Sequence, residues 1–128
     1  MYTILVVDDD PCVRELVNIV FECRPYRILE AECACQAIRL ARDVRPDLVL
    51  LDVVLPNSIS GLEVCSTLKM DPVTRSIRII MLSAMADPRD IHSGREAGAD
   101  GYLTKPFRLA NLIRTVEGAL SWRRLPGS

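Results

Sequence analysis

Residues 3–11 have the sequence TILVVDDDP, in which a short β-branched apolar run ends in three aspartates and a proline. An uninterrupted apolar run of this length predicts a strand that is buried on both faces of a sheet. Asp10 and Pro11 then provide an N-cap and a first-turn proline, which predict that a helix begins here. Residues 47–52, DLVLLD, repeat the pattern of an apolar run that ends in an aspartate. A buried strand followed by a helix is therefore the repeating unit of this chain.

The same unit accounts for the remaining segments. Further strands are predicted at residues 26–30, 77–82 and 101–105, and helices at residues 11–24, 34–45, 62–68, 88–98 and 109–120. Strands that alternate with helices imply a parallel sheet with right-handed crossovers and helices on both faces. We expect an α/β fold with a doubly wound, five-stranded parallel sheet in the order 2-1-3-4-5, a flavodoxin-like (βα)5 three-layer sandwich.

Length and charge exclude several classes of protein. The 128 residues, 49% of them hydrophobic, fit one folded domain. Because 16 basic and 17 acidic residues leave a net charge of −1, no overall field directs the chain to nucleic acid or an anionic membrane. No apolar run approaches the roughly 20 residues of a membrane span, and no basic signal-peptide region follows Met1. We expect a soluble cytoplasmic protein without a membrane or direct nucleic-acid partner.

The five cysteines are an odd number in a chain that can bury a core without cross-links. We therefore expect reduced thiols rather than a disulfide framework. Cys33 and Cys35 suggest a metal site, but tetrahedral zinc needs a second ligand pair, and the only histidine, His92, lies far along the chain. Cysteine as a small buried hydrophobe is the favoured interpretation.

Polar side chains collect at the predicted carboxyl ends of the strands. They are Asp8, Asp9 and Asp10 after the first strand, Asp52 after the third, Ser83 after the fourth, and Thr104 and Lys105 at the fifth. Doubly wound sheets bind ligands at this edge, where the strand order reverses. Helix capping explains Asp10, which precedes Pro11. It does not explain Asp52, because no helix begins directly after it.

Three neighbouring carboxylates repel one another unless a cation neutralises them, and hard oxygen ligands suit Mg²⁺ or a similar ion such as Mn²⁺. Lys105, one of only two lysines in the chain, would place a compact ammonium beside these acids. Acids, a divalent ion, a lysine and a hydroxyl can together bind a phosphoryl group. Asp52, on the central strand, is the candidate nucleophile.

Four motifs in order resemble a response-regulator receiver domain of two-component signalling. They are residues 4–10 (ILVVDDD), 46–52 (PDLVLLD), 81–84 (MLSA) and 103–107 (LTKPF). The resemblance implies that Asp52 accepts a phosphoryl group from a sensor histidine kinase or a histidine phosphotransfer protein. It implies no enzyme activity beyond the domain's own phosphorylation and dephosphorylation. We expect a receiver domain over residues 1–122, and a C-terminal tail or the start of a linker over residues 123–128.

The resemblance also assigns roles to single residues. The expected ligands of Mg²⁺ or Mn²⁺ are Asp8, Asp9, Asp52 and the backbone carbonyl of Val54. Ser83 and Lys105 would contact the phosphoryl oxygens, and the peptide bond between Lys105 and Pro106 is expected to be cis. Tyr102 would turn inward when Ser83 moves toward the phosphate. The face formed by the fourth helix, fifth strand and fifth helix would then change shape and control an output domain, an output partner or a homodimer.

Three departures from the family pattern stand out. Four residues separate Pro56 from Gly61 where the family has three, so we expect the loop to bulge. Arg78 replaces a proline that many members have, with little expected effect. Val54 and Met85 occupy positions that tune hydrolysis in the family, and neither side chain can orient a water molecule. We therefore hypothesise slow loss of the phosphoryl group.

Rival interpretations use the same fold. An FMN-binding protein needs a phosphate loop rich in Ser, Thr and Gly after the first strand, and the acids of residues 8–10 would repel FMN phosphate. A phosphatase of the haloacid-dehalogenase type needs a second acid where Val54 stands. A degenerate receiver that binds a partner without phosphorylation is the remaining alternative. The chain is compatible with a protein that acts alone, through a partner, or within a longer regulator.

Overall fold

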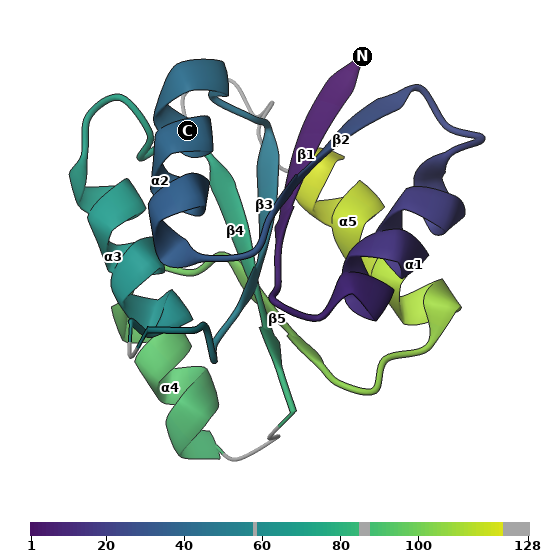
Figure 1. The fold of residues 1–128 in the computed structure, drawn as a ribbon. Helices are drawn as coiled ribbons and strands as arrows, with labels where there is room; N and C mark the ends of the chain where they lie inside the picture. Colours follow the sequence, from purple (N-terminus) through teal and green to yellow (C-terminus); the bar gives the residue numbers. More distant parts are fainter. Residues whose placement is uncertain (58, 85–87, 122–128) are drawn as a thin grey trace.

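The computed structural model describes residues 1–57, 59–84 and 88–121, and its strands form one five-stranded parallel sheet (Figure 1). The strands are β1 (Tyr2–Val7), β2 (Tyr26–Ala31), β3 (Leu48–Asp52), β4 (Arg78–Ser83) and β5 (Gly101–Thr104). Their order is β2-β1-β3-β4-β5, so the direction of winding reverses between β1 and β3. The predicted doubly wound α/β fold and its strand order are confirmed.

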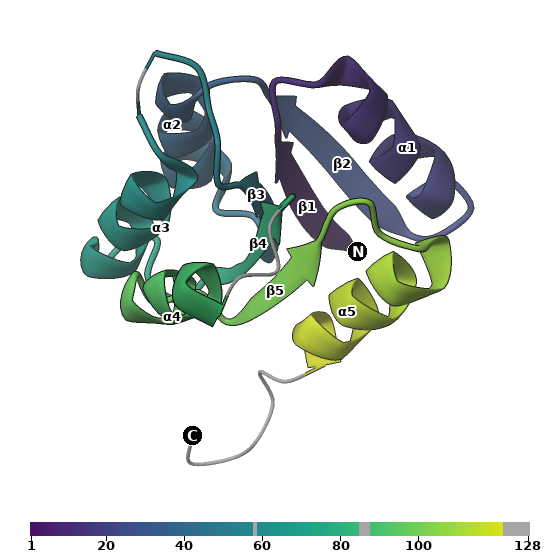
Figure 2. The same ribbon diagram turned by 90° about the horizontal axis from the view of Figure 1, so that it is seen from below.

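Helices cover both faces of this sheet, as Figure 2 shows. One face carries α1 (Pro11–Phe21) and α5 (Leu109–Ser121), and the other carries α2 (Ala34–Val44), α3 (Gly61–Met70) and α4 (Pro88–Glu96). The arrangement is the predicted three-layer sandwich, in which each strand leads into a helix on one side or the other.

Two apolar clusters, one on each face, explain the uninterrupted apolar runs. Ile4 and Val6 of β1 pack with residues of α1 and α5, whereas Leu5 and Val7 pack with residues of α2 and α3. All four side chains are fully buried. Successive side chains of a strand point to opposite faces, so a strand covered on both faces needs apolar residues at every position.

Local hydrogen bonds and backbone conformations set where α1 begins, where α2 ends and where β3 begins. The side chain of Asp10 accepts a hydrogen bond from the Cys12 amide at 2.9 Å and caps α1, as predicted. Arg45 closes α2 in the left-handed conformation, with φ at 52°. The third strand begins at Leu48, one residue later than predicted. Asp47 instead turns its carboxylate to the Thr3 amide, at 2.8 Å.

All five cysteines are free thiols, but the prediction of buried cysteines holds only for Cys65, because Cys33 is partly buried and Cys12, Cys23 and Cys35 are exposed. Cys65 is buried in the cluster beneath α3, and burial raises the pKa of its thiol to about 11, so it packs as a neutral apolar group. In the part of the chain that the structure describes, no helix is long and apolar enough to cross a membrane. The predicted domain boundary at residues 122–123 and the position of Met85 lie outside the described residues.

Candidate functional site

Strand register brings the predicted site residues to one edge of the sheet. Val7 pairs with Leu51, so Asp8, directly after β1, and Asp52, the last residue of β3, lie at the same level of neighbouring strands. On the other side of β3, Asp52 pairs with Leu82, and Ser83 then pairs with Thr104 of β5. The carboxyl ends of parallel strands meet at this edge. The structure thus brings together side chains that lie up to 97 residues apart in the chain.

Two carboxylates and one ammonium form the centre of the site. Asp8 is fully buried, and Asp52 is 7% exposed. The Nζ atom of Lys105 donates to Oδ2 of Asp8 at 2.6 Å and to Oδ2 of Asp52 at 3.1 Å. The other oxygen of each carboxylate accepts from a backbone amide, that of Asp10 at 2.9 Å and that of Val54 at 3.1 Å respectively. Every carboxylate oxygen of this pair therefore has a donor, which satisfies buried polar groups.

The acids also form a group that suits a divalent cation. One carboxylate oxygen from each of Asp8, Asp9 and Asp52 lies within 4.8 Å of the others. Asp9 is the exposed member of the three. Oxygen ligands of this charge fit Mg²⁺ or Mn²⁺. Among the described residues this is the only group of three or more acidic, histidine or cysteine ligands at such distances, so Cys33 and Cys35 have no third ligand there.

Burial and charge shift the proton affinities of the central groups. The pKa of Asp52 is raised, chiefly because burial disfavours its charge, and the neighbouring Asp8 carboxylate adds to this. The hydrogen bond from Val54 and the charge of Lys105 oppose the shift without cancelling it. Burial by itself would lower the pKa of Lys105, but its hydrogen bonds and attraction to Asp8 and Asp52 outweigh burial and raise it. Lys105 therefore stays a cation throughout the neutral range.

The loop after Asp52 is held back against the strand. Val54 and Ser60 form an isolated antiparallel bridge, and the Gly61 amide donates to the Val53 carbonyl at 2.7 Å. Asn57 lies in the left-handed region at φ 68°, a conformation that asparagine tolerates. The expected bulge includes residue 58, which is outside the described residues.

Gly61, which marks the end of the loop in the family pattern, has a further role in this site that the sequence did not predict. A Cβ atom at this position would lie 1.9 Å from the carbonyl oxygen of Asp52, closer than any two such atoms can approach. Gly61 therefore lets the first turn of α3 pack directly on the backbone of Asp52. The only signal in the sequence is a glycine next to the capping serine, Ser60, whose hydroxyl accepts from Leu62.

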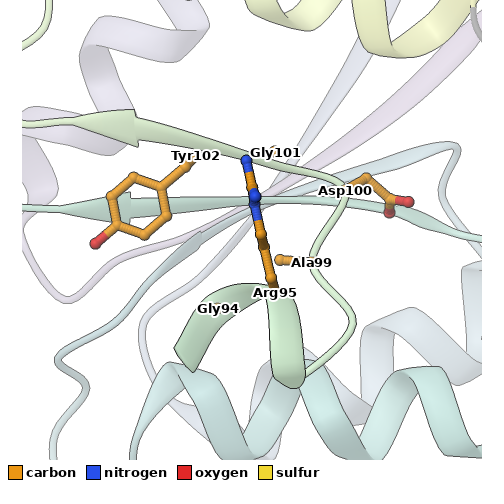
Figure 3. A pocket seen from close by; sticks show the side chains of 6 residues that line it. All are labelled: Gly94, Arg95, Ala99, Asp100, Gly101 and Tyr102. Atoms are coloured by element: carbon orange, nitrogen blue, oxygen red, sulfur yellow. The ribbon is translucent and has the colours of Figure 1, made fainter. Parts of the chain in front are cut away.

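The remaining predicted residues lie on β4, on β5 and directly after β5. Ser83 is buried at 5% exposure, and its carbonyl accepts from the Lys105 amide at 2.6 Å. The peptide bond between Lys105 and Pro106 is cis. Tyr102 is half-buried and lines a cavity of about 120 Å³ between α4 and β5 (Figure 3). In Figure 3 the Tyr102 ring and the Asp100 carboxylate lie on opposite sides of the Arg95 side chain.

Fold and site together define a single α/β domain with a lysine-bridged acidic cluster at the point where its strand order reverses. The model of the response regulator receiver domain matches residues 4–117, and the chain belongs to this family. The phosphate regulon transcriptional regulatory protein PhoB of Pseudomonas aeruginosa is 42% identical over 118 residues, which cover 92% of this chain and 51% of that protein. The chain spans about half the length of the curated relatives it matches.

Solved structures agree with this classification. A response regulator from Chloroflexus aurantiacus superposes with a TM-score of 0.87 at 34% identity, covering 93% of this chain and 97% of that one. The receiver domain of the sensor histidine kinase PA1611 from Pseudomonas aeruginosa has a TM-score of 0.83 at 29% identity, with the same coverage of 93% and 97%. That structure has a magnesium ion coordinated in its active site cleft.

Proposed function

We propose that this chain is a phospho-accepting receiver whose Asp52 takes a phosphoryl group from a sensor histidine kinase or a histidine phosphotransfer protein in the cytoplasm. The observation that carries the proposal is the position of Lys105, whose ammonium contacts both Asp8 and Asp52. A cation held beside a carboxylate nucleophile is what a phosphoryl group needs, because negative charge gathers on its oxygens during transfer.

In the proposed reaction a carboxylate oxygen of Asp52 attacks the phosphorus atom of the donor phosphohistidine. A new O–P bond forms as the N–P bond breaks, and the donor imidazole keeps the electron pair and takes up a proton. Lys105 and Ser83 contact the phosphoryl oxygens. Asp8, Asp9 and Asp52, with the backbone carbonyl of Val54, would hold Mg²⁺ or Mn²⁺, which when bound neutralises charge on those oxygens.

The proposed output is a change on the face formed by α4, β5 and α5. A phosphoryl group adds about −1.5 to −2 charges and three acceptor oxygens, which would draw Ser83 toward it. Tyr102 lies on the neighbouring strand, beside Gly94 of α4, and would fill the space that Ser83 leaves. An output domain, an output partner or a second copy of the chain would bind the changed face. The curated relatives are about twice as long, and PhoB is named a transcriptional regulator, which supports an output domain in such a protein.

Intact-mass spectrometry tests this function. After incubation with Mg²⁺ and acetyl phosphate we expect one phosphoryl adduct in the wild type and none in Asp52→Asn or in the presence of EDTA. The alternative is a degenerate receiver that binds its partner without phosphorylation. Absence of both an adduct and beryllofluoride binding in the wild type would favour that alternative.

A further inference from the structure

Arg14 of α1 reaches the end of β1, next to the acidic cluster. Its Nη1 atom donates to the main-chain carbonyl of Asp8 at 2.7 Å, and its side chain is 15% exposed. The carbonyl belongs to the peptide unit that joins Asp8 to Asp9, two of the three acids in the cluster. Arg14 takes no part in the proposed phosphoryl transfer.

The guanidinium of Arg14 is itself held from two sides. Its Nε atom donates to Oε1 of Glu30 on β2 at 3.0 Å, and its Nη2 atom lies 3.7 Å from a carboxylate oxygen of Glu32. Asn18, one turn along α1, donates to the other oxygen of Glu30 at 3.0 Å and also to the Arg14 carbonyl. The guanidinium group is planar and rigid. Because Glu30 holds its Nε edge, the opposite edge can donate to the Asp8 carbonyl from one direction only.

This contact completes the restraints on Asp8. The Asp8 amide donates to the Ala31 carbonyl at 3.1 Å, so Arg14 holds the only other polar group of its backbone. A peptide unit is planar, and fixing its carbonyl therefore fixes the direction in which the chain enters Asp9. Asp9 is exposed, so its carboxylate depends on its backbone for its place in the cluster.

We propose that Arg14 is a positioning residue, which sets the plane of the peptide between Asp8 and Asp9 and thereby the affinity of the acidic cluster for a divalent cation. The proposal rests on the cation site of the proposed function. Groups outside the coordination sphere that orient metal ligands commonly change metal affinity by about 10- to 100-fold when they are lost.

The sign of the effect separates positioning from charge. Removing a positive charge near a cation site strengthens cation binding if the arginine acts only through its field. Removing the hydrogen bond that orients Asp8 and Asp9 weakens it. Arg14→Met removes both the positive charge and the hydrogen bond to the Asp8 carbonyl. Arg14→Lys keeps the charge but cannot contact Glu30 and the Asp8 carbonyl from two edges of one planar group.

Arg24 provides the matched control. It follows α1, donates from Nη1 to the Val20 carbonyl at 3.2 Å, and pairs through Nε with Glu117 at 3.4 Å. Arg24→Met thus removes an arginine with one carbonyl and one carboxylate partner, but one that lies at the far end of α1 from Asp8.

Each variant is titrated with Mn²⁺, and electron paramagnetic resonance measures the concentration of free Mn²⁺. The unfolding midpoint of each variant in EDTA shows whether it is folded. We expect the Mn²⁺ Kd to rise about tenfold in Arg14→Met, and severalfold in Arg14→Lys, and to stay within about twofold in Arg24→Met. If Arg14→Met does not fold, Asn18→Ala, which takes the amide donor from one oxygen of Glu30 and so loosens the guanidinium without changing any charge, should raise the Kd about threefold.

An unchanged or lower Kd in the folded Arg14 variants would overturn the assignment, as would an equal rise in Arg24→Met. In either case Mn²⁺ binding by the wild type would leave the proposed function standing. A wild type that binds no Mn²⁺ would overturn both.

Discussion

Gly61 and Gly118 show how the space around a Cβ position decides whether a glycine-to-alanine substitution stabilises or destabilises the fold. A Cβ at Gly61 would overlap the Asp52 carbonyl at 1.9 Å, whereas one at Gly118 in α5 would meet nothing within 4 Å. We expect Gly61→Ala to destabilise the fold by about 2 kcal/mol or more. Gly118→Ala should stabilise it by about 0.5–1 kcal/mol, because alanine is the better helix former. Urea unfolding measures both, and equal effects of the two changes would contradict this account.

The raised pKa of Asp52 predicts a pH-dependent stability. A folded-state pKa above the unfolded value of 3.8 means that ionised Asp52 costs stability, a cost that appears as the pH rises through the folded-state pKa. Asp52→Asn should therefore be more stable than the wild type at neutral pH. Its advantage should disappear below a pH of about 4, where Asp52 is protonated in both states. Unfolding curves at several pH values test this, and a constant difference would contradict it.

Val54 carries the hypothesis of slow dephosphorylation. Val54 is 74% exposed beside Asp52, and its side chain has no polar atom to orient an attacking water molecule. Val54→Asn adds such an atom and should shorten the lifetime of the phosphorylated protein by about tenfold, which is less than the roughly 100- to 10,000-fold of general acid–base catalysis because an amide orients the water without taking its proton. Decay of the phosphorylated mass gives the rate, and Val54→Ala, which adds no polar atom, is the control. The hypothesis fails if Val54→Asn and Val54→Ala decay alike.

At the scale of elements, Lys69 connects α3 to the residues that directly precede β4 and β5. Its Nζ atom donates to the Ile77 carbonyl at 2.7 Å and to Oδ2 of Asp100 at 2.8 Å. The same Asp100 oxygen accepts from the Ile79 amide at 2.9 Å. Both lysines of the chain therefore serve ion pairs that join separate elements, whereas the many exposed cations are arginines.

Loss of the Lys69 ion pair should cost more than loss of an exposed one. The side chains of Lys69 and Asp100 are only 16% and 25% exposed, so Lys69→Met leaves a carboxylate with little solvent. We expect a loss of about 2–3 kcal/mol. Arg42→Met, which breaks the pair with Asp71 while Arg42 is 55% exposed, should cost less than about 1 kcal/mol. Urea unfolding measures both variants. Similar losses of stability in Lys69→Met and Arg42→Met would show that burial of the ion pair does not determine its contribution.

At the scale of the whole molecule, the proposed switch predicts which segments change their backbone hydrogen exchange on phosphorylation. Hydrogen–deuterium exchange with Mg²⁺ and beryllofluoride should change in peptides that cover β5 and the neighbouring parts of α4 and α5. Exchange in α2, which α3 separates from α4, should stay the same (Figure 2). Asp52→Asn is the control and should show no change. A uniform change over all helices would point to general stabilisation by the ligand rather than to a switch.

Much of the site could be predicted because it follows from strand ends. Asp8, Asp52 and Ser83 each stand where an apolar run stops, and parallel strands must bring such positions to one edge. Arg14 and Gly61 could not be found this way. The carbonyl acceptor of Arg14 lies six residues away, directly after β1, and Glu30 lies sixteen residues away on β2. Many arginines on a helix surface could make such contacts, and the sequence does not tell which of them does. The role of Gly61 exists only as a distance to Asp52.

The sequence by itself determined the alternation of strands and helices, the strand order and the family. Periodicity, Asp10 with Pro11, and the four motifs are local properties that depend on the chain alone. Tertiary structure decided which groups touch: Lys105 between Asp8 and Asp52, Arg14 on the Asp8 carbonyl, and the burial that raises the pKa of Asp52. Distances and desolvation arise only when distant segments pack, because both depend on the atoms that surround a group in space.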